Sequence, residues 1–79
     1  MSDAANDSAL AVLEEVMERA LDEAQTARRL GQRDRLRAFV EVLSWAKQQA
    51  AVMDLPPFAN HALNQLDPES LLAAAKQAA

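Results

Sequence analysis

The only glycine in this chain, Gly31, separates two stretches in which apolar residues recur at alternating spacings of three and four. This heptad spacing keeps one apolar seam of a helix facing one neighbouring helix. A glycine just past a helix end supplies the left-handed backbone conformation that terminates the helix. We therefore predict two helices that turn at Gly31 and pack antiparallel as a hairpin. The seams are Leu10, Leu13, Met17, Ala20, Ala24 and Ala27 before the glycine, and Leu36, Phe39, Leu43, Ala46, Ala50 and Met53 after it.

The composition predicts an all-α fold, because Ala, Leu, Glu, Gln and Arg dominate while Ile and Tyr are absent. We expect helices over residues 8–30, 33–53, 57–66 and 68–77, in a single helical domain of residues 8–79 that follows a flexible N-terminus of residues 1–7. The pair Pro56-Pro57 ends the second helix, and Asp67-Pro68-Glu69 carries the signals that begin the last one. The expected fold is a small bundle: the hairpin plus two short C-terminal helices.

The size of the chain limits its hydrophobic core. A chain of 79 residues buries only about 60% of the surface that its unfolded form exposes, and there is no cysteine to form a stabilising disulfide. Homodimerisation is therefore one way to complete the bundle. No secretory signal and no apolar stretch of membrane-spanning length are visible, which predicts a cytoplasmic protein without a membrane partner. The abundance of Ala and Arg points to a bacterial or phage source.

Candidate catalytic and metal-binding residues are few. His61 is the only histidine, so it lacks companion ligands for a metal, and no serine has a nearby base in the sequence. Glu14 and Glu18 lie one helical turn apart, and we interpret them as part of a solvated helix face. No glycine-rich loop is present to bind phosphate. We therefore predict that the chain is not an enzyme and has no catalytic residue, cofactor or metal site.

Charge is distributed unevenly along the chain. Residues 1–27 carry a net charge of −6, residues 28–47 carry +4 and the remainder carries −2. Arginine side chains in a cluster can bind carboxylates or phosphates through bidentate contacts. Alternatively, Arg28 and Arg29 stabilise the C-terminal end of the first helix by complementing its dipole. In that case Asp34 and Glu41 neutralise the other arginines locally. Net acidity and the lack of interleaved aromatic residues argue against nucleic acid. The cluster around the predicted turn consists of Arg28, Arg29, Arg33, Arg35 and Arg37.

Trp45 gives the second helix a further apolar face. Together with Val42 and Val52, it falls on the side of the helical wheel away from the seam, so this helix has apolar residues on two sides. One interpretation is that residues 55–72 fold back and cover Trp45 with Phe58, Leu63 or Leu66. The other is that Trp45 anchors an interface with a second copy or another protein, since tryptophan and arginine are favoured at binding hot spots.

These observations favour a non-enzymatic protein-interaction module, a small adaptor or inhibitor of bacterial or phage type. Its partner is expected to be a protein of unknown identity, with a homodimer as a further option. Two alternatives stay open: a nucleic-acid-associated regulator that uses the cluster from Arg28 to Arg37, and a phage-type inhibitor of a host complex that uses the acidic first helix. The expected partner-binding residues are Trp45, Val42, Val52, Arg28, Arg29, Arg33, Arg35 and Arg37.

Overall fold

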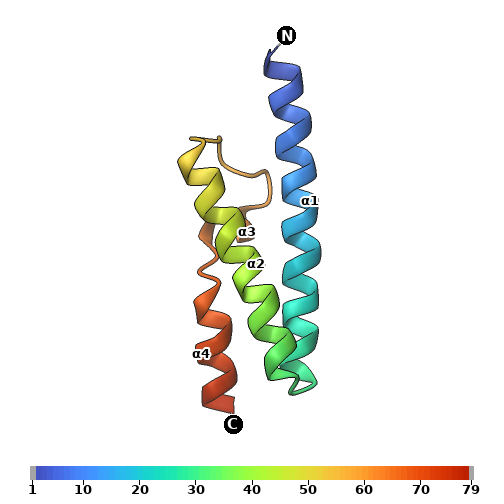
Figure 1. The fold of residues 1–79 in the computed structure, drawn as a ribbon, viewed down its shortest axis with the longest axis vertical. Helices are drawn as coiled ribbons and strands as arrows, with labels where there is room; N and C mark the ends of the chain where they lie inside the picture. Colours follow the sequence, from blue (N-terminus) through green and yellow to red (C-terminus); the bar gives the residue numbers. More distant parts are fainter. Residues whose placement is uncertain (1, 79) are drawn as a thin grey trace.

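The computed structural model describes the backbone of residues 2–78 and the side chains of residues 8–73. Two long helices, α1 (Ser2–Arg29) and α2 (Arg33–Val52), pack as an antiparallel hairpin (Figure 1). Two short helices follow, α3 (His61–Gln65) and α4 (Glu69–Ala78). In Figure 1, α3 lies behind α2, and α4 runs alongside α2 toward the end of the molecule that holds the hairpin turn. The predicted all-α hairpin with two short C-terminal helices is confirmed.

The first helix starts earlier than predicted. α1 begins at Ser2 and not at Ser8, so residues 2–7, which we expected to form a flexible N-terminus, continue the helix. This start has a local cause. Ala4 and Ala5 are strong helix formers, which favours an earlier helix start.

Gly31 ends α1 in the conformation that the sequence predicts. Its φ of 71° lies in the left-handed region. The N–H of Gln32 donates to the carbonyl of Ala27 at 2.9 Å, and the N–H of Gly31 donates to the carbonyl of Arg28 at 3.2 Å. These two bonds form a Schellman motif, which satisfies carbonyl groups at the helix end. A Cβ at this position would meet no atom within 4 Å, so glycine is favoured by the backbone angle and not by crowding.

The core of the hairpin follows the predicted seams. Small seam residues of α1 combine with larger residues of α2, a combination that lets two helices approach closely without leaving voids. Met53 departs from the prediction: it is exposed, because α2 ends at Val52 and the chain turns away there. The buried residues of the hairpin are Met17, Ala20, Ala24, Ala27, Leu36, Val40 and Leu43.

The second helix ends in a motif that the sequence did not reveal. Asp54 has a φ of 55°, so it takes the left-handed conformation that Gly31 takes at the end of α1. The N–H of Leu55 donates to the carbonyl of Ala50 at 3.0 Å, and the N–H of Asp54 donates to the carbonyl of Ala51 at 3.1 Å. This is a second Schellman motif. The helix therefore ends before the proline pair that we expected to stop it.

The C-terminal segment packs against one side of the hairpin and completes the core. Phe58, Leu63 and Leu71 are buried together with the seam residues of α1 and α2. α4 begins as predicted, because the Asp67 carboxylate accepts a hydrogen bond from the N–H of Glu69 at 3.2 Å. α3 is shorter than the predicted 57–66. None of the helices in the described part of the chain is both long and apolar enough to span a membrane.

Candidate functional site

Several polar residues that could carry chemistry instead hold the C-terminal segment in place. The Lys47 ammonium group on α2 donates to the carbonyls of Leu63 at 3.1 Å, Asn64 at 3.3 Å and Leu66 at 2.6 Å. These carbonyls lie at the C-terminal end of α3, where a positive charge is stabilising. Lys47 therefore has a structural role, which its position in the sequence did not signal because its partners are 16–19 residues away.

Glu14 and Glu18 form a clamp for the loop before α3. The Glu14 carboxylate accepts from the backbone N–H of Asn60 at 2.7 Å, and the Glu18 carboxylate accepts from the side-chain amide of Asn60 at 2.9 Å. The Asn60 side chain in turn caps α3 by accepting from the N–H of Ala62 at 2.9 Å. Glu18 is exposed, as expected of a solvated helix face, but both carboxylates also hold a distant loop, which we did not predict. Hydrogen bonding to a distant loop explains their placement without acid–base chemistry.

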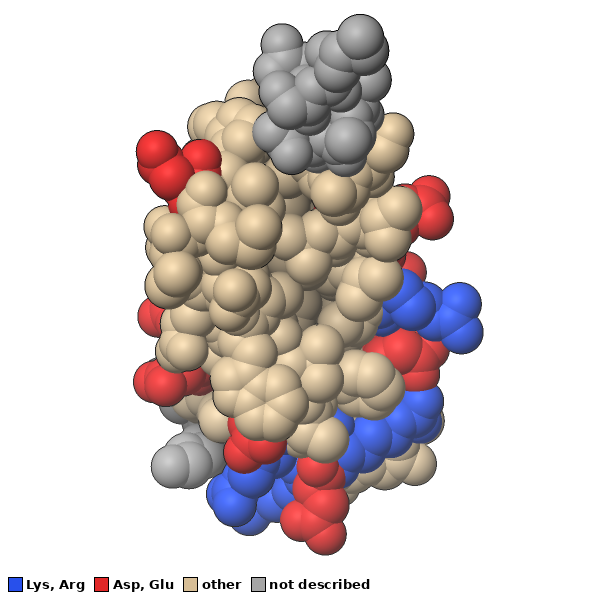
Figure 2. Space-filling view, turned by 45° about the horizontal axis from the view of Figure 1, so that its top comes forward, with Lys and Arg blue, Asp and Glu red and all other residues tan. Residues whose placement is uncertain are grey.

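The five arginines of the predicted cluster gather at the turn end of the hairpin, and we call them the arginine tip. Figure 2 shows basic side chains concentrated at this end of the visible face. Arg35 pairs with Glu23 on α1, donates to the Gln32 side chain at 3.2 Å and lies 5.8 Å from the centre of the Phe39 ring. Arg35 therefore helps to fasten α1 to α2.

The other four members of the arginine tip are less engaged. Arg29 donates to the Thr26 hydroxyl at 3.2 Å. Within the side chains of residues 8–73, no ion pair is formed by Arg28, Arg29, Arg33 or Arg37. Asp34 and Glu41 thus do not neutralise the tip by direct pairing, contrary to the local alternative above. These four guanidinium groups therefore have no carboxylate partner among residues 8–73.

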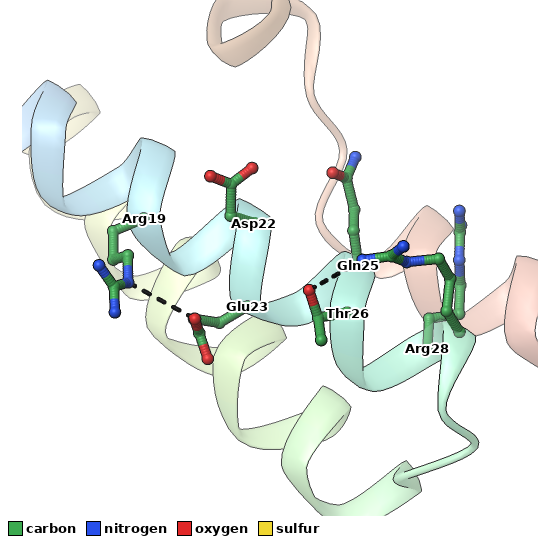
Figure 3. A pocket seen from close by; sticks show the side chains of 7 residues that line it. Arg19, Asp22, Glu23, Gln25, Thr26 and Arg28 are labelled. Atoms are coloured by element: carbon green, nitrogen blue, oxygen red, sulfur yellow. Dashed lines mark hydrogen bonds and ion pairs between the residues drawn. The ribbon is translucent and has the colours of Figure 1, made fainter.

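An open depression of about 570 Å³ lies on the outer surface of α1 near this tip (Figure 3). Arg19 and Glu23 form an ion pair across it at 3.5 Å, and Asp22 adds a second acid. All of its lining residues come from one helix, so the depression has no opposing wall that could enclose a ligand. We assign it no function. It is lined by Arg19, Asp22, Glu23, Gln25, Thr26, Arg28 and Arg29.

Trp45 lies at the surface with 63% of its area exposed, and Val52 is 80% exposed. Of the two interpretations of Trp45, the one in which residues 55–72 cover it does not hold. Phe58 and Leu63 are buried in the hairpin core, and Leu66 packs against that core. The reason is the position of Lys47, which draws α3 to a different side of α2 through three hydrogen bonds. Val42, Trp45 and Val52 therefore remain accessible, and we call them the outer face of α2.

A groove of about 380 Å³ connects the outer face to the arginine tip. It runs between α2 and α4, and both Arg37 and Trp45 line it, together with Glu69 and Leu72 of α4. The structure thus brings one arginine of the predicted cluster and the predicted aromatic anchor to the same depression. Sequence reasoning treated them as separate features, because the placement of α4 beside α2 was not predicted.

A second apolar surface lies between α1 and α2, on the side that α3 does not cover. Val12 and Val16 on α1 are 64% and 51% exposed. A hollow of about 430 Å³ next to them also involves Phe39 and Val42 of α2. We call this surface the hairpin groove. Sequence reasoning missed it, although the position of Val12 and Val16 outside the α1 seam could have indicated it. The hollow is lined by Glu15, Val16, Arg19, Ala20, Phe39 and Val42.

The described residues contain no cluster of three or more His, Asp or Glu side chains that could hold a metal ion. Comparison with known proteins adds no assignment: no model of a protein family, no curated protein and no solved structure matches this chain. Three surfaces of the described chain are therefore candidates for binding: the outer face of α2, the arginine tip and the hairpin groove.

Proposed function

We propose that this chain is a non-enzymatic protein-interaction module that binds a protein partner through the outer face of α2 and the arginine tip. The observation that supports this proposal is the exposure of Trp45, the only tryptophan, between the exposed residues Val42 and Val52. Tryptophan and arginine are the residues most enriched at the energetic centres of protein interfaces. A large aromatic side chain that no described part of the chain covers is well suited to anchor a partner.

The charge of the arginine tip defines the chemistry of the partner. Arg33 and Arg37 form no ion pair with the acids of residues 8–73, and a guanidinium group binds a carboxylate through two parallel hydrogen bonds. Arg37 and Trp45 are separated by about 12 Å along α2 at 1.5 Å per residue. An amphipathic helix of three turns can therefore contact both. We expect the partner segment to present an apolar side chain to Trp45 and acidic side chains to the tip.

A protein partner is favoured over nucleic acid by the rest of the surface. The chain has a net charge of −4, and Asp22 and Glu23 of α1 line a depression together with Arg28 and Arg29 of the tip. Figure 2 shows acidic and basic side chains next to one another at this end. A phosphate backbone would be repelled by these acids. Furthermore, Trp45 stands alone and provides no platform for stacking successive bases.

Site-specific photo-crosslinking in the native cells tests the proposal. A photoreactive amino acid is placed at Trp45 or Val52, and at the exposed Gln65 of α3 as the matched control. We expect a discrete adduct with a second protein from positions 45 and 52 and none from position 65. The adduct should be reduced severalfold by Arg33→Glu combined with Arg37→Glu, because the acidic segment of the partner would be repelled.

Two results would overturn the proposal. One is the same set of adducts from position 65 as from position 45, which would mean that the contacts are non-specific. The other is loss of the adduct after nuclease treatment, which would favour the nucleic-acid alternative. An adduct between two copies of this chain alone would also count against a separate protein partner at this face.

A further inference from the structure

We infer that the hairpin groove is covered by a second copy of this chain, which packs antiparallel about a twofold axis and forms a four-helix bundle. This inference goes beyond the proposed partner, because it concerns the surface between α1 and α2 and not the outer face of α2. The two surfaces meet at Val42. Each can be tested without the other.

The first reason is that one side of the hairpin is covered and the other is not. In Figure 1, α3 lies behind the hairpin, while α1 and α2 are open toward the viewer. A hollow between α1 and α2 is lined by Val16, Phe39 and Val42, and Val12 and Val16 are more than half exposed. Figure 2 shows a broad area without charged side chains on the visible face. Two such apolar faces that pack together give the core of an antiparallel helical bundle.

The second reason is the arrangement of charge along the molecule. Acids outnumber bases in residues 1–27, whereas the arginine tip lies at the other end of α1. A twofold axis perpendicular to the hairpin places the tip of each copy beside the acidic half of α1 in the other copy. A parallel arrangement would instead place the two tips together, and that repulsion disfavours it. Charge complementarity therefore selects a second copy in the antiparallel orientation.

The third reason is a self-complementary pair within the groove itself. Glu15 and Arg19 both line the hollow and lie on either side of the Met17 level of α1. A twofold axis at this level places Glu15 of each copy opposite Arg19 of the other. A twofold interface repeats every contact, so this geometry makes two ion pairs. It also gives the contact a defined register.

A second copy would have a long face to pack against. The molecule measures 49 × 19 × 17 Å along its principal axes, and a standard stable interface buries roughly 800 Å² on each partner. The hollow itself is local, so the contact would extend beyond it along α1 and α2. The isolated core is small, since three of the ten buried hydrophobic residues within residues 8–73 are alanines. Burial of Val12 and Val16 against a second copy would add the apolar area that one copy lacks.

Light scattering on the purified full chain tests the inference. We expect a mass twice the 8.6 kDa of one chain at hundreds of micromolar, shifting toward one chain on dilution. Val16→Lys should weaken the dimer at least tenfold, because it places a charge in the interface. Val52→Lys is the matched control: this valine is more exposed but lies on the outer face of α2. Circular dichroism confirms that both variants keep their helices.

A charge exchange tests the antiparallel register. Glu15→Arg and Arg19→Glu should each weaken the dimer severalfold, because each opposes like charges across the axis. The double variant should restore it to near the wild-type level. A wild-type chain that is monomeric at hundreds of micromolar would overturn the inference, as would a dimer disrupted by Val52→Lys but not by Val16→Lys. Failure of the double variant to rescue would overturn the antiparallel pairing.

These outcomes are distinct from those for the proposed function. Scattering uses the purified chain alone, so a monomer contradicts the second copy without bearing on a partner at Trp45. Conversely, the absence of a crosslinked partner at position 45 contradicts the proposed function and leaves the dimer measurement unchanged.

Discussion

Two residues with left-handed backbone, Gly31 and Asp54, end the two long helices of the hairpin. Both form the same pair of hydrogen bonds, yet only one of them is a glycine. For a residue with a Cβ, this conformation raises the free energy of the folded state by about 1–2 kcal/mol. Asp54 also places a negative charge at the C-terminus of α2, where the helix dipole disfavours it. The sequence predicted the left-handed residue at Gly31, because glycine is the usual residue in that conformation at a helix end. It did not predict the one at Asp54, since the prolines that follow already explained why the helix stops.

We predict that Asp54→Gly stabilises the fold. Removal of the unfavourable conformation and charge outweighs the greater entropy of an unfolded glycine, so the free energy of unfolding should rise by about 0.5–1 kcal/mol. Urea denaturation followed by circular dichroism measures this change. Asp22→Gly, at an exposed position in the middle of α1, is the matched control and should lower the free energy by about 0.3 kcal/mol. A shift of the same sign in both variants would contradict the explanation.

At the scale of elements, α3 is a helix of five residues that cannot be stable by itself. Its position depends on contacts from both long helices: Asn60 is held by Glu14 and Glu18 of α1, while Lys47 of α2 binds the carbonyls at its end. None of these contacts is local in sequence. This explains why heptad spacing predicted α1 and α2 with their seams, whereas the bounds of α3 were not predicted correctly and the sequence left open whether Trp45 is covered.

We predict that Lys47→Met makes α3 open locally more often, while Leu63 stays in the core and the chain still unfolds as one unit. The substitution removes three hydrogen bonds from a charged donor, and such bonds contribute about 1.5–3 kcal/mol. Amide hydrogen exchange should accelerate in residues 61–66 and change little in the middle of α1. Gln48→Met, at the adjacent exposed position, serves as the control and should alter the free energy of unfolding by less than about 0.5 kcal/mol. Unchanged exchange in α3 of the Lys47 variant would show that apolar packing alone holds this helix.

At the scale of the whole molecule, the surfaces follow from how the C-terminal segment uses the hairpin. Local signals predicted which residues form helices and which sides of α2 are apolar. They did not determine which of those sides residues 55–72 would cover, because that choice is made by long-range hydrogen bonds and by Phe58, Leu63 and Leu71 entering the core. The exposure of the outer face of α2 and of the hairpin groove is a consequence of that choice.

Because the core of the hairpin includes side chains of the C-terminal segment, we predict that the stability of the whole bundle depends on one leucine of α3. Leu63 is fully buried among residues of the hairpin, and replacing a buried leucine with alanine costs about 2–5 kcal/mol. A chain of this length has a total stability of about 4–12 kcal/mol. Leu63→Ala should therefore lower the thermal midpoint by more than about 8 °C, with α1 and α2 melting in the same transition. Leu30→Ala, at an exposed leucine beside the turn, is the control and should shift the midpoint by only a few degrees. If both variants melt near the wild-type temperature, the hairpin folds without its C-terminal segment, and the core described above would not act as one cooperative unit.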